Sequence, residues 1–166
     1  MTVNSPAMKK KGGKVAYLTP VEPTEPHKAP VAEAELPDHF ILDETGALFA
    51  GRHLIIDLWD VPGGFLADMD LISRTLTEAA KIAGATLLNI DLHRFEPNGG
   101  ISGVAVLAES HISIHTWPER GYAAIDAFMC GNAKPERSLE VLRRSFKPGR
   151  IDSKEFRRGI VVEGHE

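Results

Sequence analysis

A serine and two histidines lie close together in this chain, at Ser110, His111 and His115, and the single cysteine follows at Cys130. A hydroxyl beside imidazole bases suits nucleophilic chemistry, and a thiol can transfer a proton or attack a substrate. The segments on both sides are apolar and typical of strands, so these reactive groups are expected within a sheet. Burying them costs free energy unless they are paired, which marks this segment as the centre of function.

Ordinary explanations stay open for each of these residues. On a strand, Ser113 and His115 can form a polar pair that faces water, and a lone cysteine is more often a small buried apolar side chain. A metal site is possible because three histidines can converge, although no carboxylate or thiol lies at a ligand spacing from His93, His111 and His115.

The position of Ser110 favours chemistry on the backbone. Ser110 is not in a Gly-x-Ser-x-Gly turn and has no evident third orienting residue, which argues against a hydrolase. On an unbroken strand Ser110 and His115 face opposite sides, so they meet only if the chain bends or breaks at Glu109–Ser110. A strained peptide whose serine hydroxyl reaches the preceding carbonyl is what backbone self-cleavage requires.

The elements that must position these residues can be read from the hydrophobic pattern. Strands are predicted over 51–59, 86–95, 103–108, 112–117 and 122–130, helices over 65–83 and 135–146, and an edge strand over 159–162. This order predicts an α+β fold, a two-layer α/β sandwich with a mainly antiparallel sheet and helices on one face. Two strands are apolar on both faces, so a second copy of the chain is expected to cover the other face.

Composition sets the remaining limits. The five prolines between residues 20 and 37 predict a disordered N-terminal arm over 1–38, in which Val15–Leu18 is a weak strand candidate, followed by a single domain over 39–166. The net charge of −4 argues against a nucleic-acid partner. One cysteine favours a reducing, cytoplasmic setting. No segment resembles a secretory signal or a membrane span.

One segment resembles a known family closely. Ala108-Glu109-Ser110-His111-(x)3-His115-Thr116-Trp117-Pro118-Glu119-(x)-Gly121-Tyr122-Ala123, followed by Cys130-Gly131, is similar to the prokaryotic S-adenosylmethionine decarboxylase proenzyme. The resemblance extends through Gly51-Arg52-His53 and His93-Arg94-Phe95 and covers about residues 50 to 147.

This resemblance implies a precursor that cuts itself between Glu109 and Ser110. The Ser110 hydroxyl attacks the Glu109 carbonyl, His115 acts as the processing base, and Ser102 assists. The products are a β chain, residues 1–109, and an α chain, residues 110–166, which starts with a pyruvoyl group made from Ser110. That group, rather than pyridoxal phosphate or a metal, forms a Schiff base with the substrate, and Cys130 donates the proton that replaces CO2.

The resemblance also implies a substrate and a partner. Phe95 and Trp117 match the aromatic side chains that hold the adenine of S-adenosylmethionine, and Glu119 matches the acid that binds the ribose. The expected product is the aminopropyl donor for spermidine and polyamine biosynthesis, and the expected assembly is an αββα homodimer of processed units. The alternatives are an arginine or ornithine decarboxylase on the same fold and a non-catalytic nucleoside-binding relative. The loop over Glu96–Gly100 is one residue longer than the family pattern, so it is expected to reshape the pocket.

Overall fold

The computed structural model describes residues 40–44 and 46–161. The predicted arm over 1–38, with its candidate strand Val15–Leu18, lies outside the described residues. Contacts divide the chain into two units, Met1–Ala32 and Glu33–Glu166, and every described residue belongs to the second. The start of a compact domain at residue 39 therefore remains a prediction.

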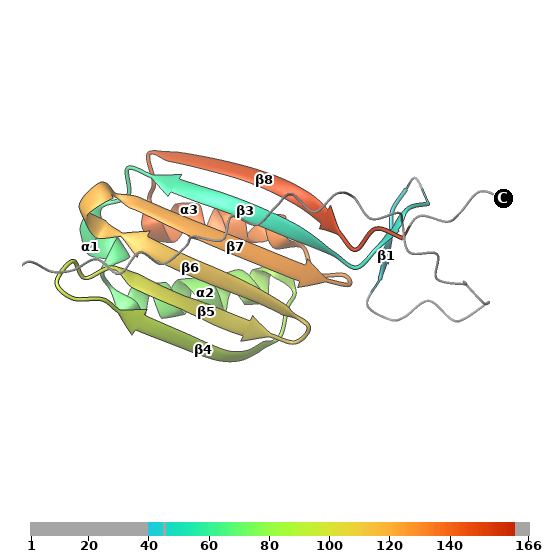
Figure 1. Cartoon of the computed structure of the whole chain (residues 1–166), viewed down its shortest axis with the longest axis horizontal. Helices are drawn as coiled ribbons and strands as arrows, with labels where there is room; N and C mark the ends of the chain where they lie inside the picture. Colours follow the sequence, from blue (N-terminus) through green and yellow to red (C-terminus); the bar gives the residue numbers. More distant parts are fainter. Residues whose placement is uncertain (1–39, 45, 162–166) are drawn as a thin grey trace, which may run out of the picture. The chain divides into compact units, whose positions relative to one another are not determined.

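A six-stranded antiparallel sheet organises the described part of the chain (Figure 1). The strands lie in the order β4-β5-β6-β7-β3-β8. Their bounds are β3 Gly51–Trp59, β4 Leu87–Arg94, β5 Ile101–Leu107, β6 Ser110–Trp117, β7 Tyr122–Cys130 and β8 Arg150–Arg158. A small hairpin, β1 (Ile41–Leu42) with β2 (Leu48–Phe49), precedes them.

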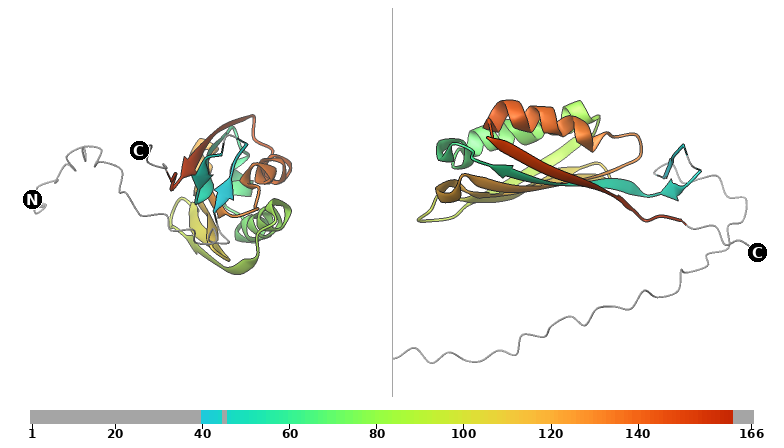
Figure 2. Two further views of the ribbon diagram at one scale, coloured as in Figure 1. Left: turned by 90° about the vertical axis from the view of Figure 1, so that its right-hand side faces the viewer. Right: turned by 90° about the horizontal axis from the view of Figure 1, so that it is seen from above.

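The helices lie on one face of this sheet (Figure 2). They are α1 (Gly63–Leu66), α2 (Met69–Ala83) and α3 (Ser138–Phe146), with short 3-10 turns η1 (Pro118–Arg120) and η2 (Pro135–Arg137). The predicted α+β class and two-layer arrangement are confirmed. None of the described helices is long and apolar enough to cross a membrane.

Alternation along the strands explains why the sheet has one covered face. In β7 the side chains of Ala123, Ile125, Ala127 and Met129 are fully or almost fully buried against the helices. The intervening side chains, Tyr122 to Cys130 in steps of two, point to the opposite face, which we call the open face, and they are only partly buried. Large apolar side chains on exposed positions of this face are Ile55, Val106, Trp117 and Phe156.

Two expectations need correction. The helix predicted over 65–83 is two helices, because the Asp68 carboxylate accepts a hydrogen bond from the Leu71 N–H and caps a new helix there. The edge strand predicted over 159–162 lies earlier, over β8, which pairs with β3 along its whole length. Its sequence, RIDSKEFRR, has too few apolar residues to reveal a strand, since most of its side chains are exposed.

Candidate active site

A two-residue turn at Ala108 and Glu109 joins β5 to β6. Leu107 pairs with Ser110 across this turn, so the expected scissile peptide lies at the tip of a tight hairpin. Glu109 has a φ of 62°, in the left-handed region that favours glycine. The bend expected at Glu109–Ser110 is therefore present, and it places a non-glycine residue in a costly backbone conformation.

Ser110 lies beside Cys130. The Ser110 Oγ accepts a hydrogen bond from the backbone N–H of Cys130 at 3.2 Å. Burial raises the pKa of the Cys130 thiol, and the nearby charge of Glu109 raises the pKa further. The thiol is thus held in its protonated form, which is the form that a proton donor requires.

A second polar pair lies at the other end of the same strands. The Ser102 Oγ and the His115 Nδ1 are 2.8 Å apart, and these two residues are directly opposite each other in β5 and β6. Each can donate or accept in this bond, depending on the tautomer of the imidazole.

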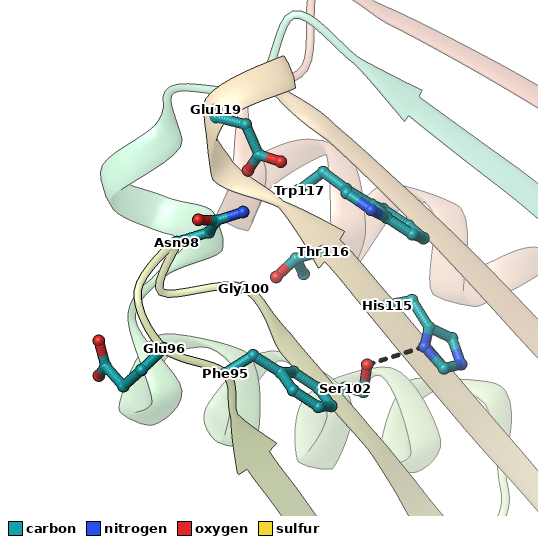
Figure 3. Close-up of a pocket in the computed structure, with 9 residues that line it drawn as sticks. All are labelled: Phe95, Glu96, Asn98, Gly100, Ser102, His115, Thr116, Trp117 and Glu119. Carbon is teal, nitrogen blue, oxygen red and sulfur yellow. Dashed lines mark hydrogen bonds between the residues drawn. The ribbon is translucent and has the colours of Figure 1, made fainter. Parts of the chain in front are cut away.

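The Ser102–His115 pair is part of the lining of a pocket (Figure 3). Residues from three places line it: the end of β4 with the loop that follows, β5, and the end of β6 with η1. They are Phe95, Glu96, Asn98, Gly100, Ser102, His115, Thr116, Trp117 and Glu119. Every residue that was predicted to bind the substrate is in this set.

The aromatic side chains of the pocket are free to receive a flat ring. Phe95 is 50% exposed and Trp117 is 40% exposed, which is high for such large apolar groups. One side of Trp117 stacks on Tyr122, with ring centroids 5.2 Å apart, and His93 packs edge-on against Phe95 at 4.6 Å. These contacts fix the orientation of both rings while leaving surface for a ligand.

Thr116 and Gly100 hold the pocket together, and sequence reasoning missed both. The buried Thr116 hydroxyl accepts from the Ile101 N–H and donates to the Leu66 carbonyl, each at 2.8 Å. Gly100 packs so closely that a Cβ there would lie 2.8 Å from the Thr116 carbonyl oxygen. The sequence does hold a signal for Thr116: it shares a face of β6 with the apolar residues Ile112 and Ile114, and a polar side chain on a buried face must find hydrogen-bond partners.

Ser110 and His115 do not meet within one chain. Strand β6 is continuous from Ser110 to Trp117, and the two residues are five positions apart. At about 3.3 Å per residue their backbones are separated by about 17 Å. The reactive residues therefore form two clusters, which we call the Ser110 cluster (Glu109, Ser110, Cys130) and the His115 cluster (Ser102, His115 and the pocket).

Metal ligands do not gather in the described part of the chain. No group of three or more His, Cys, Asp or Glu side chains among these residues has a spacing suited to a metal ion. His53 lies 3.4 Å from Asp126, which also accepts a hydrogen bond from Ser113, and the ring of His53 is 6.4 Å from that of His111. This polar group lies on the open face between the two clusters.

Comparison with known proteins decides the family. Residues 52–159, more than half of the chain, match the family model described as S-adenosylmethionine decarboxylase. The chain belongs to the S-adenosylmethionine decarboxylase family.

Relatives named S-adenosylmethionine decarboxylase proenzyme support this membership. The chain is 45% identical over 115 residues to one from Methanococcus maripaludis, which covers 69% of this chain and 93% of the relative. It is 50% identical over 109 residues to one from Prochlorococcus marinus, which covers 65% of this chain and 86% of the relative.

A solved member of the family has the same fold. The crystal structure of the adenosylmethionine decarboxylase from Aquifex aeolicus superposes with a TM-score of 0.62 at 37% identity. The match covers 70% of this chain and 96% of that chain. The sheet and helices described above are therefore those of an S-adenosylmethionine decarboxylase.

Proposed function

We propose that this chain is a self-processing decarboxylase that converts S-adenosylmethionine to its decarboxylated form, the aminopropyl donor for polyamine synthesis. The observation that carries this proposal is the strained Glu109–Ser110 turn with the Ser110 hydroxyl beside Cys130. Family membership supports the choice of substrate, since the relatives are named for it. The lone cysteine suits a cytoplasmic enzyme.

Processing would begin with the Ser110 Oγ attacking the Glu109 carbonyl carbon, which replaces the amide by an ester. A base then removes the Cα proton of Ser110, and β-elimination releases Glu109 as a carboxylate. Water replaces the nitrogen of the resulting dehydroalanine, ammonia leaves, and a pyruvoyl group remains on the chain that begins at position 110. The β chain, 1–109, and the α chain, 110–166, are the products.

The surroundings of Ser110 fit a pyruvoyl group. Its Oγ already lies within hydrogen-bond reach of a backbone N–H, and a protonated thiol is adjacent. When formed, the group supplies a carbonyl that accepts the electrons released as CO2 leaves. Cys130 would then donate the proton that takes the place of CO2 on the substrate carbon.

The base for processing must come from outside the Ser110 cluster. Among the described residues, His115 is the imidazole paired with a serine hydroxyl, but it is about 17 Å from Ser110 along β6 of the same chain. We infer that His115 of one protomer serves Ser110 of its partner. This arrangement makes the dimer part of the active site.

Simple geometry supports such a dimer. The open face exposes Ile55, Val106 and Phe156, so packing two open faces together would bury apolar surface. A two-fold axis between the sheets and perpendicular to the strands reverses strand direction. The start of β6 in one protomer then lies near the end of β6 in the other, which brings each Ser110 cluster to the partner's His115 cluster. The result is an αββα homodimer.

The pocket suits a charged nucleoside. Phe95 and Trp117 offer π faces for the adenine and for the positive sulfonium, which is attracted to such faces. Glu119 offers carboxylate oxygens to the ribose hydroxyls. Arginine and ornithine have no adenine, so these aromatic groups would be left without a ligand.

The decisive experiment combines mass spectrometry with a substrate assay. The purified full chain should appear as two fragments divided at Glu109–Ser110, and CO2 should be released from S-adenosylmethionine in preference to arginine and ornithine. Borohydride with substrate should inactivate the enzyme by fixing the substrate to the α chain. An intact chain without activity would refute the proposal. CO2 release from arginine or ornithine alone would show that one of these amino acids, and not S-adenosylmethionine, is the substrate. Ser110→Ala should abolish cleavage and activity. If the chain were instead a non-catalytic nucleoside-binding protein, the same substitution would leave nucleoside binding unchanged.

A further inference from the structure

The loop between β4 and β5 closes one side of the pocket and is firmly anchored. The Phe95 N–H donates to the Gly100 carbonyl at 2.8 Å, and the Gly99 N–H donates to the Phe95 carbonyl at 2.9 Å. The next residue, Ile101, donates its N–H to the buried Thr116 hydroxyl. The loop tip, Glu96 to Gly99, therefore has a defined position relative to β6.

Glycines allow this loop to lie close to β6 and η1. Gly99 has a φ of 69°, and Gly100 has no room for a Cβ beside the Thr116 carbonyl. This path brings the side chain of Asn98 into the pocket lining, near Trp117 and Glu119.

Figure 3 shows how the polar side chains of the loop are directed. The amide of Asn98 is turned toward the carboxylate of Glu119, and the carboxylate of Glu96 points away from the pocket. Among the described residues that line the pocket, Asn98 carries the only side-chain amide. The hydroxyls of Ser102 and Thr116 are already engaged, with His115 and with Leu66 and Ile101 respectively.

A sugar diol needs both kinds of hydrogen-bonding partner. Each ribose hydroxyl donates one hydrogen and accepts through its oxygen, whereas an ionised carboxylate only accepts. Glu119 can receive the hydroxyl hydrogens but cannot satisfy the hydroxyl oxygens. The Asn98 amide provides N–H donors on the same side of the pocket.

We propose that Asn98 is a specificity-determining residue, which donates to a ribose hydroxyl that Glu119 holds from the other side. The inference rests on the proposed function, because it assumes that the pocket receives a nucleoside. It assigns recognition of the sugar to two residues from different elements, Asn98 from the β4–β5 loop and Glu119 from η1.

The test measures the binding of 5′-deoxy-5′-methylthioadenosine and its 2′-deoxy and 3′-deoxy analogues to the full chain by calorimetry. For the wild-type chain, we expect loss of the hydroxyl that Asn98 contacts to weaken binding roughly tenfold. In Asn98→Ala, binding of the parent nucleoside should weaken to a similar extent, and the penalty for removing that hydroxyl should fall to about twofold.

Two further variants sharpen the result. Asn98→Asp keeps the size but replaces the donor by a second carboxylate beside Glu119, so it should bind the parent nucleoside more weakly than Asn98→Ala does. Glu136→Gln changes an exposed carboxylate of η2 that is outside the pocket lining, so the loss of affinity on removing either ribose hydroxyl should match that of the wild-type chain. If removing each ribose hydroxyl weakens binding as much in Asn98→Ala as in the wild-type chain, the role of Asn98 is overturned and the proposed substrate is not. A wild-type chain that does not bind the nucleoside would overturn both this inference and the proposed substrate.

Discussion

Glu109 has a backbone conformation that most side chains avoid, and we expect this strain to help cleavage. Its φ of 62° costs about 1–2 kcal/mol relative to the right-handed regions, and the cost disappears when the following peptide bond breaks. Glu109→Gly adopts this φ without penalty. The precursor of this variant should therefore process more slowly, by roughly fivefold to thirtyfold, in a time course of fragment appearance.

The matched control separates strain from charge. Glu109→Gln keeps a long side chain in the same left-handed turn and removes only the carboxylate, so its strain is retained. We expect it to process faster than Glu109→Gly. Equal rates of processing for the two variants would show that the strained backbone conformation of Glu109 does not accelerate cleavage.

Cys130 should act after processing rather than during it. Cys130→Ala is expected to yield normal fragments, because the group that it contributes to Ser110 is a backbone N–H. Its turnover should fall by about 10²-fold or more if the thiol is the proton donor. Normal turnover of the processed variant would refute this role.

The raised pKa of Cys130 gives a prediction about pH. Because burial and the Glu109 charge both favour the neutral thiol, Cys130 stays protonated to a higher pH than an ordinary cysteine. A proton donor fails when it has lost its proton, so kcat should decline only at a pH above the range in which an ordinary cysteine titrates. A pH profile of kcat measures this limit, and a decline near neutral pH that Cys130→Ser abolishes would contradict it.

At the scale of elements, Thr116 connects β6 to the start of β5 and to the end of α1. Thr116→Val keeps the shape but leaves the Ile101 N–H and the Leu66 carbonyl without this partner inside the protein. Such a loss costs about 1–3 kcal/mol. Urea unfolding should show a lower free energy of unfolding, and nucleoside binding should weaken because the pocket loop is anchored through Ile101.

Thr77→Val is the control for this substitution. The Thr77 hydroxyl donates to the Ser73 carbonyl within α2 and is exposed, so water can replace the bond. Its free energy of unfolding should change by about 0.5 kcal/mol or less. An equal change in the free energy of unfolding for the two substitutions would show that burial of the Thr116 hydroxyl does not increase its contribution to stability.

Much of the sheet could be predicted because its strands alternate or are apolar throughout. The ranges expected for β3 and β7 agree with the structure, and the helices on one face follow from their apolar stripes. The strand β8 could not be found from periodicity, since its exposed side chains follow no apolar pattern and its place depends on pairing with β3. The β1–β2 hairpin is too short to give a signal.

The pocket could be predicted only through the family resemblance. Phe95 and Glu119 are far apart in the sequence, and only the pairing of β4, β5 and β6 brings them to one place. Side-chain parity predicted that Ser110 and His115 would not meet on an unbroken strand, and the continuous strand β6 keeps their backbones about 17 Å apart in one chain. The bend is at Glu109, and it turns the hairpin without moving His115 toward Ser110.

At the scale of the whole molecule, the proposed dimer makes two inactive variants complementary. A Ser110→Ala chain keeps His115, and a His115→Ala chain keeps Ser110. In a mixed dimer, Ser110 of the second chain faces the intact His115 of the first, so the second chain should be cleaved. Co-expression with different tags, followed by mass spectrometry, identifies which chain is cut.

Each variant expressed alone provides the control. Ser110→Ala should remain intact, and His115→Ala should stall at the ester, which hydroxylamine cleaves. If co-expression leaves the His115→Ala chain uncut although mixed dimers form, the base acts within its own chain or lies elsewhere. A monomeric mass at micromolar concentration in light scattering would exclude the shared site altogether.

The order of the strands has a consequence for refolding. A cut at Glu109–Ser110 would assign β3, β4 and β5 to one fragment and β6, β7 and β8 to the other. In the sheet these fragments alternate, meeting at β5–β6, at β7–β3 and at β3–β8. The mature protein would therefore be an interleaved heterodimer that cannot separate without loss of the sheet. The precursor folds as one molecule, at a rate independent of concentration, whereas the denatured mature enzyme would have to reassemble from two, by a second-order reaction that slows on dilution.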